Sequence, residues 1–314
     1  MGIIRLNGCG VSFNVIGGGK MGTEDWSEWL PLEAVAVDGS VKWWYDGVEF
    51  VCWEVLMRPV ADVYVPWIGV VSNYGDWAYV PIFGPVALEL SEQRYCGGCF
   101  QELPDEQGGG VCEFCSVRYE ADEGWCIVPR CSGVVPFCHG RALEQFKEEE
   151  FVVYLGNYGN LILVGMGCYE AIERQIILQG IDRAVILTGK EGYLNWEMAH
   201  KSYQAMKAAY NFDLGAFITK VENLKGDRGA GVQKVDRLAR AITQSLGLRE
   251  MEVYELWDQY FNIPERPQLY PEEKWLVGDV KGAKGNVLFI QRGQKTYVFD
   301  LWDLLGRKLM NVRG

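Results

Sequence analysis

The chain has 314 residues, of which 49% are hydrophobic and 23% are charged, so it can bury a core and is not expected to be disordered. This length suggests roughly two or three domains. Its apolar runs fall short of the ~18 residues that a membrane helix needs, and no charged-then-apolar leader opens the chain. We therefore expect a cytoplasmic protein with no membrane association.

The charge is distributed unevenly along the chain. Residues 1–150 carry a net charge of −14 and residues 151–314 a net charge of +2, which together give the formal charge of −12. A protein that coats nucleic acid along its whole surface would be basic. General polyanion binding is therefore disfavoured, whereas a local nucleic-acid site in the second half stays open.

Residues 1–90 are predicted to form a β-rich aromatic domain. Short runs of β-branched and aromatic residues alternate with turns such as Asp38-Gly39 and Asp46-Gly47, as hairpins require. Five tryptophans lie between Trp43 and Trp77. We interpret them as a small aromatic core or sheet face; the alternative is a surface that stacks on a ligand. A protein partner could bind through this tryptophan-rich region.

Residues 91–140 are predicted to form a cysteine-rich, zinc-binding module. Seven of the ten cysteines lie there, and the two Cys-x-x-Cys pairs are Cys96 with Cys99 and Cys112 with Cys115. Two such pairs at this spacing are typical of a closed, tetrahedral and structural zinc site. The alternatives are free thiols or two disulfides. Clustered pairs without a secretion signal favour the metal.

A second group of potential ligands follows in the same module: Cys126, Cys131, Cys138 and His139. These residues could hold a second zinc ion, or some of them could complete or support the first site. Neighbouring ligands such as Cys138 and His139 rarely bind the same ion. The sequence therefore predicts one or two structural zinc ions.

Residues 151–250 are predicted to form an α/β domain. Strands are expected at 151–155, 161–164 and 184–188, and helices at 169–178 and 196–210, which gives the order β-β-α-β-α. Asn195 is the expected N-cap of the second helix, and Gly180 ends the first.

A further helix at 231–246 places Lys234, Arg237 and Arg240 on one face. This face is either ordinary solvated surface or a nucleic-acid-binding stripe that faces phosphates.

After a proline-containing linker, strands at 275–280, 286–290 and 295–301 predict a small C-terminal β cap over residues 270–314.

Three residues of the α/β domain have the side chains that phosphodiester cleavage needs. Glu197 could bind a divalent ion, Arg174 could hold phosphate charge, and Tyr154 could position or deprotonate water. Each also has an ordinary structural interpretation. Tyr154 could be a core aromatic, Arg174 a helix-surface charge, and Glu197 a partner of the helix dipole.

Short motifs of the α/β domain occur in a recognisable order: Phe151-Val-Val-Tyr154-Leu155, Leu163-Val164-Gly165, Gln179-Gly180-Ile181, and Glu197. This order resembles the core of the GIY-YIG endonucleases. More specifically, it resembles an uncharacterised family of cysteine-rich archaeal and bacterial proteins with a GIY-YIG-like core. The segments Cys126-Ile-Val-Pro-Arg-Cys131 and 278–290 resemble flanking features of that family, so the resemblance covers about residues 94–310.

The resemblance implies roles for individual residues. Tyr154 takes the place of the GIY tyrosine, Arg174 that of the helix arginine, and Glu197 that of the metal-binding glutamate. Leu163 stands where the nucleases have a second tyrosine, which indicates a degenerate core.

The expected fold class is α+β: a β-rich N-terminal region, the zinc module, a GIY-YIG-like β-β-α-β-α core and the β cap. The expected function is binding or processing of nucleic acid, with Mg²⁺ or Mn²⁺ at Glu197 if the protein is a metal-dependent endonuclease. The alternative is a non-enzymatic, zinc-stabilised scaffold for protein–protein interaction.

Overall fold

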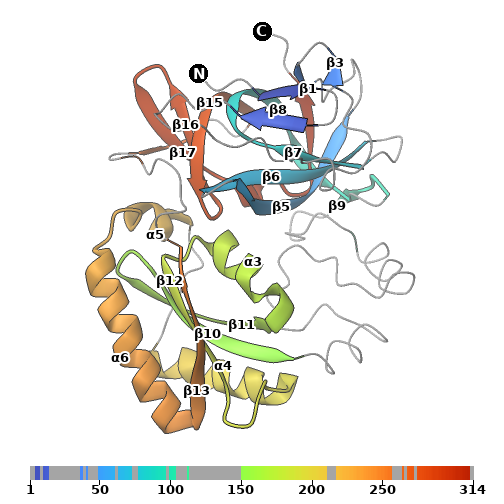
Figure 1. Cartoon of the computed structure of the whole chain (residues 1–314). Helices are drawn as coiled ribbons and strands as arrows, with labels where there is room; N and C mark the ends of the chain where they lie inside the picture. Colours follow the sequence, from blue (N-terminus) through green and yellow to red (C-terminus); the bar gives the residue numbers. More distant parts are fainter. Residues whose placement is uncertain are drawn as a thin grey trace.

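The computed structural model consists of two lobes that pack against each other (Figure 1). It describes residues 4–7, 10–13, 36–37, 40–41, 49–60, 63–72, 77–96, 99–103, 112, 150–210, 217–256, 264, 267–271 and 274–311. We call the two lobes the sheet lobe and the helix lobe. None of the described helices combines the length and the apolar character that a membrane crossing requires.

The sheet lobe is built on one mixed sheet of ten strands, in the order β14-β17-β16-β15-β8-β18-β5-β6-β7, with β9 pairing to β8. The β14–β17 pair is parallel, whereas the other pairs are antiparallel. The strands are β5 (Phe50–Val60), β6 (Val63–Ser72), β7 (Trp77–Pro81), β8 (Gly84–Tyr95), β9 (Glu102–Leu103), β14 (Gln268–Leu269), β15 (Trp275–Lys284), β16 (Val287–Arg292), β17 (Lys295–Asp300) and β18 (Arg307–Asn311). A short 3-10 helix, η3 (Leu301–Leu304), joins β17 to β18.

Strands from the two ends of the chain share this sheet. β15 pairs with β8 from Trp275 opposite Glu89 to Val280 opposite Gly84, and β18 lies between β8 and β5. The three predicted C-terminal strands are confirmed as β15, β16 and β17. The small β cap of the predicted fold class is wrong, because the backbone hydrogen bonds of these strands continue into the N-terminal strands within one sheet.

The helix lobe has a four-stranded antiparallel sheet, in the order β11-β10-β12-β13, with helices on both faces. Its strands are β10 (Phe151–Tyr158), β11 (Leu161–Cys168), β12 (Arg183–Gly189) and β13 (Leu248–Glu255). Its helices are α3 (Tyr169–Gln179), α4 (Trp196–Tyr210), α5 (Phe217–Glu222) and α6 (Arg228–Leu246). Elsewhere, β1 (Ile4–Asn7) pairs with β2 (Gly10–Phe13), and β3 (Ala36–Val37) pairs with β4 (Ser40–Val41).

Alternation along β10 explains why this sheet is covered on both sides. Val152 and Tyr154 pack in one cluster with the buried residues of α3, whereas Phe151, Val153 and Leu155 pack in another cluster with α4 and α6. Because successive side chains of a strand point to opposite faces, an almost wholly apolar strand such as β10 requires a cover on each face.

The predicted fold class is wrong, although the predicted elements between residues 151 and 246 are present. The described part of the chain is mostly sheet, and its largest element is the mixed ten-stranded sheet. In addition, β13 returns as a fourth strand beside β12 after two further helices. This arrangement does not fit a GIY-YIG-like β-β-α-β-α core. Whether the four predicted ranges act as separate domains stays a prediction.

The two lobes share one hydrophobic core. A single cluster joins residues of the sheet lobe, such as Ile68 and Phe289, to residues of the helix lobe, such as Ile176. The backbones also approach closely. Gly180, which ends α3 at φ 74°, and Gly285, at φ 60° in the β15–β16 turn, are so near that a Cβ on either would collide with the backbone of the other segment. Only glycine combines this backbone conformation with this proximity.

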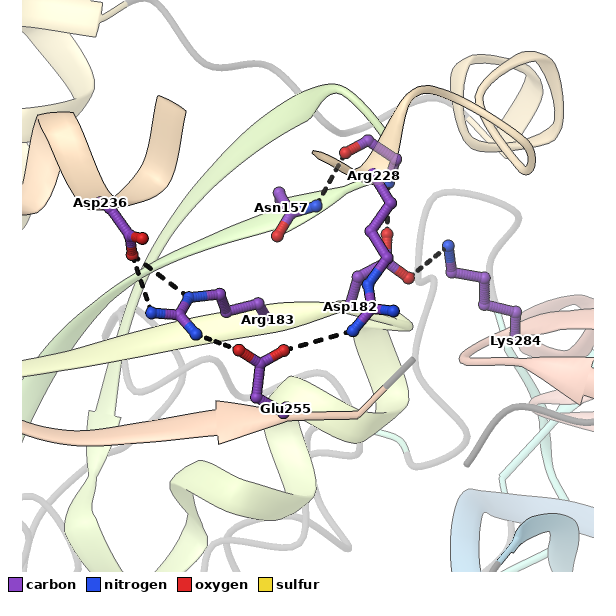
Figure 2. A network of polar contacts seen from close by, with 8 residues as sticks. Asn157, Asp182, Arg183, Arg228, Asp236, Glu255 and Lys284 are labelled. Carbon is purple, nitrogen blue, oxygen red and sulfur yellow. Dashed lines mark hydrogen bonds and ion pairs between the residues drawn. The ribbon is translucent and has the colours of Figure 1, made fainter. Parts of the chain in front are cut away.

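The turn that contains Gly285 places a buried ion pair between the lobes. The Lys284 Nζ lies 2.7 Å from the Asp182 Oδ1, and neither side chain is exposed to solvent. The Gly159 N–H donates to the Asp182 Oδ2 at 2.5 Å, and the Lys284 Nζ lies 3.9 Å from the centre of the Tyr158 ring. Figure 2 shows Lys284 entering from the sheet lobe toward Asp182. Burial raises the pKa of the Asp182 carboxyl and lowers the pKa of the Lys284 amine, while each partner's charge opposes the shift.

We expect Lys284→Met to lower the free energy of unfolding by about 3–5 kcal/mol, because it leaves a buried carboxylate without its partner. Adding Asp182→Asn removes that charge and keeps the acceptor for Gly159, so the double variant should be more stable than Lys284→Met alone. Urea unfolding measures both values. The control is Lys281→Met on the same strand: Lys281 pairs with Asp279 at the surface, and its loss should cost less than about 1 kcal/mol. Equal losses in Lys284→Met and Lys281→Met would contradict a dominant role for the buried pair.

Candidate metal centre

The turn between β8 and β9 brings three cysteines together. Cys96 directly follows β8, and β9 folds back so that Tyr95 lies opposite Glu102. The Cys96 N–H donates to the Gln101 carbonyl oxygen at 2.8 Å, and the Phe100 N–H donates to the Cys96 carbonyl oxygen at 2.8 Å. These bonds close a tight turn that points the thiols of Cys96 and Cys99 toward Cys112.

The three sulfur atoms have the spacing that one metal ion requires. The Sγ atoms of Cys96, Cys99 and Cys112 all lie within 4.8 Å of one another, and those of Cys99 and Cys112 are 3.7 Å apart. Metal–sulfur bonds of about 2.3 Å in a tetrahedron place two sulfurs roughly 3.8 Å apart. A disulfide needs a separation of about 2.05 Å, so the distance between Cys99 and Cys112 fits shared metal binding rather than a covalent bridge.

One backbone N–H donates to a sulfur atom of the site. The Cys112 N–H donates to the Cys96 Sγ at 3.2 Å, and a backbone donor of this kind stabilises negative charge on sulfur. Cys96 is fully buried beside Leu103, whereas Cys99 is exposed. One ligand is thus anchored in the sheet lobe, and the ion would sit at the surface of that lobe.

Among the described residues, this trio is the one group of three or more cysteine, histidine or acidic side chains close enough to share an ion. The predicted fourth ligand, Cys115, lies outside the described residues. So do all members of the predicted second site: Cys126, Cys131, Cys138 and His139. A metal site that includes Cys96, Cys99 and Cys112 is supported, and the rest of the ligand set stays a prediction.

The structure does not bring the three predicted catalytic residues into one pocket. Tyr154 is buried on the face of the helix-lobe sheet that α3 covers. Its ring lies against Gly165 of β11, where any Cβ would collide with the phenol, and its side chain hydrogen-bonds to Gln179. Burial raises the pKa of this phenol, which therefore stays protonated.

Arg174 and Glu197 differ from this phenol, and from each other, in their surroundings. Arg174 forms an ion pair across the lobe junction with Glu54 of β5, whose side chain is buried. Glu197 is exposed in the first turn of α4, a helix that packs on the opposite face of the sheet from Tyr154. The predicted cap of that helix is confirmed, because Asn195 Oδ1 accepts the Met198 N–H at 2.9 Å. Glu197 is therefore placed as a partner of the helix dipole.

The predicted basic stripe is at the surface. Lys234, Arg237 and Arg240 are all exposed on α6, and the buried residues of that helix, such as Val235 and Ala239, face the sheet. Of the five tryptophans between Trp43 and Trp77, Trp43 and Trp44 lie outside the described residues. Trp67 is buried against Leu56 and Val65 in the sheet lobe, as expected for a core aromatic.

The most unusual polar groups of the described residues are at the lobe junction, and they are not among the site residues predicted from the sequence. They include the buried ion pair of Asp182 with Lys284, and the hydrogen-bonded set formed by Lys220, Asn286 and Asp300. A signal was present in the sequence: a lysine and an asparagine flank Gly285 directly before the apolar run Val287–Ile290.

No family model matches the chain, and neither a curated protein nor a solved structure shows significant similarity to it. The resemblance to the cysteine-rich family therefore stays a prediction.

We expect Cys99→Ser or Cys112→Ser to lower the bound metal by one ion per chain, because each removes a thiolate ligand. Elemental analysis of protein purified without oxygen measures this loss. Cys168→Ser is the control, since Cys168 lies at the end of β11, outside the trio, and should leave the metal content unchanged. Unchanged metal content in both ligand variants would contradict the site.

Phe100 provides a test of the turn itself. It is the one described non-glycine residue with positive φ, at 59°, a conformation that costs roughly 1–2 kcal/mol for an L-amino acid. Phe100→Gly should therefore raise the thermal midpoint of the metal-loaded protein. A lower midpoint would mean that contacts of the phenylalanine ring outweigh the relief of strain.

Proposed function

We propose that this protein is a non-enzymatic, zinc-stabilised nucleic-acid-binding protein that contacts phosphates through the outer side of α4 and α6. One observation carries the proposal: five exposed basic side chains lie on two helices that cover the same face of the helix-lobe sheet. They are Lys201, Lys207, Lys234, Arg237 and Arg240.

The basic residues of this surface are available for a ligand. Within the described part of the chain, none of the five forms an ion pair. The neighbouring acid Asp236 is already bound, since it accepts hydrogen bonds from the Arg183 Nε at 3.2 Å and Nη2 at 2.9 Å (Figure 2). Glu197 is the exposed acid on these two helices, so the surface carries a positive charge.

The charge distribution of the whole chain supports this orientation. The excess of acidic residues belongs to residues 1–150, and those of them that the structure describes lie outside the helix lobe, except for Glu150, which directly precedes β10. A polyanion would therefore be repelled by the acidic half and attracted to α4 and α6. Long-range charge of this kind orients a partner before contact, and its effect weakens with salt.

Zinc is the metal that fits the cysteine trio best. Three thiolates at tetrahedral spacing are soft ligands, which select zinc over magnesium or calcium, and Cys115 is the proposed fourth ligand. A site closed by four thiolates has no position for substrate, so the ion stabilises the β8–β9 turn rather than taking part in a reaction.

The separation of the predicted catalytic residues supports binding without cleavage. The phenol of Tyr154 is buried, the guanidinium of Arg174 is paired with Glu54, and Glu197 lies on a helix of the opposite face. A metal-bound water at Glu197 would find neither the phenol nor the guanidinium within reach.

A specific feature favours the second candidate, a scaffold for protein–protein interaction. β13 is an edge strand of its sheet, and its apolar residues Met251 and Val253 are exposed. Exposed edge strands can pair with an extended segment of another protein.

The test is a titration of labelled single- and double-stranded DNA and RNA at several salt concentrations. We expect Lys234→Glu/Arg237→Glu/Arg240→Glu to weaken binding and to reduce the slope of log affinity against log salt by up to about 3. The matched control, Lys274→Glu/Lys281→Glu/Lys295→Glu, changes the net charge equally on the sheet lobe and should bind much more tightly than the α6 variant.

Equal losses of nucleic-acid affinity in the two triple variants would show that the α6 surface is not the binding site. Absence of binding by the wild-type protein at physiological salt would favour the scaffold instead. Cleavage of the nucleic acid in the presence of Mg²⁺ would contradict a non-enzymatic function.

A further inference from the structure

Three side chains with complementary chemistry meet at the lobe junction. The Lys220 Nζ of α5 lies 2.6 Å from the Asn286 Oδ1, and the Asn286 Nδ2 donates to the Asp300 Oδ1 at 2.7 Å. Asn286 lies in the β15–β16 turn, and Asp300 ends β17. An amine, a carboxamide and a carboxyl group are thus arranged in a row.

We propose that Lys220 and Asn286 react after folding to form an intramolecular isopeptide bond, with Asp300 as the proton carrier and ammonia as the leaving group. The inference is independent of nucleic-acid binding. It assigns a covalent modification to residues that neither the metal centre nor the basic surface uses.

The position of the amine favours the reaction. Because Oδ1 is bonded directly to Cγ, an Nζ within 2.6 Å of that oxygen is also close to the carbon it would attack. The amine is held by a second contact, to the Gln179 carbonyl oxygen at 3.1 Å. Two groups fixed in this way react as an intramolecular pair, at a very high effective concentration.

The surroundings exclude water. Lys220 and Asn286 are buried, and the Lys220 Nζ lies 5.2 Å from the centre of the Trp302 ring and 5.9 Å from that of the Tyr158 ring. Attack by water on the carboxamide would compete with attack by the amine, so this enclosure favours the amine.

Burial also favours the protonation states that the reaction needs. It lowers the pKa of Lys220 to about 8; the nearby charge of Asp300 opposes this shift and that of Lys284 adds to it, and a usable fraction of the amine is neutral. Burial raises the pKa of Asp300, which makes its carboxylate a stronger base than an exposed one.

The atoms balance without any other reactant. The lone pair of the neutral Lys220 Nζ attacks the Asn286 Cγ, and the Nζ–Cγ bond forms. The Asp300 carboxylate takes the proton that Nζ releases and delivers a proton to Nδ2. The Cγ–Nδ2 bond then breaks, ammonia leaves, and Asp300 returns to its starting state.

The neighbouring pair of Lys284 and Asp182 lacks this arrangement. The Asp182 Oδ2 accepts the Gly159 N–H, and the Lys284 amine faces a carboxyl group there instead of a carboxamide. A bond there would also release water rather than ammonia. The two pairs can therefore be distinguished by mass.

The first measurement is the intact mass of the full-length, unfolded and metal-free chain. We expect the wild-type mass to fall below the sequence mass by one ammonia molecule. Protease digestion should yield a branched peptide that joins the segment containing Lys220 to the segment containing Asn286. Asp300→Asn keeps a similar shape but cannot carry the proton, so it should fold and show the full sequence mass. The exposed-site control Lys225→Met should lose ammonia as the wild type does.

Three results would overturn the proposal. The first is a folded wild-type chain with its full sequence mass. The second is a loss of ammonia without a branched peptide, which would indicate a succinimide at an asparagine. The third is a loss of water with a branch between Lys284 and Asp182.

Discussion

The turn between β15 and β16 carries two buried polar side chains from the sheet lobe into the helix lobe. Lys284 reaches Asp182, Asn286 reaches Lys220, and Gly285 between them touches the backbone at Gly180. Each polar group would be costly to bury without its partner. The turn therefore fits in one position only, and this position fixes how the sheet lobe packs against the helix lobe.

Strand β8 connects this turn to the metal centre. β15 is hydrogen-bonded along β8, and β8 runs directly into the turn that holds Cys96 and Cys99. A metal ion bound there would hold the end of β8, and β8 in turn sets the register of β15. The basic helices α4 and α6 pack on the opposite face of the sheet from α3, and only the first turn of α6 reaches the junction, where Arg228 lies near Asp182 (Figure 2).

Local elements could be predicted from the sequence because their signals are local. The bounds of α4 follow from the cap at Asn195, and α3 ends where Gly180 adopts a left-handed conformation. The pairing of β15 with β8 could not be predicted, since nothing in the sequence of either strand specifies its partner. The wrong fold class results from this missing long-range pairing.

The candidate sites show the same contrast: local sequence signals could be recognised, whereas contacts between distant residues could not. Cys96, Cys99 and Cys112 were found because two Cys-x-x-Cys pairs have a spacing that is set by metal geometry. Tyr154 and Glu197 have suitable chemistry, but the face of the sheet that each helix covers depends on tertiary packing. Lys220 and Asn286 are 66 positions apart, and only the folded chain shows that they touch.

The central claim is that the inserted turn makes the two lobes one cooperative unit. Differential scanning calorimetry of the wild-type protein and Gly285→Ala tests it most directly, because a Cβ at this position would collide with the backbone at Gly180. We expect one unfolding transition for the wild type and two separate transitions, one for each lobe, in the variant. A single transition in Gly285→Ala at the wild-type midpoint would contradict it.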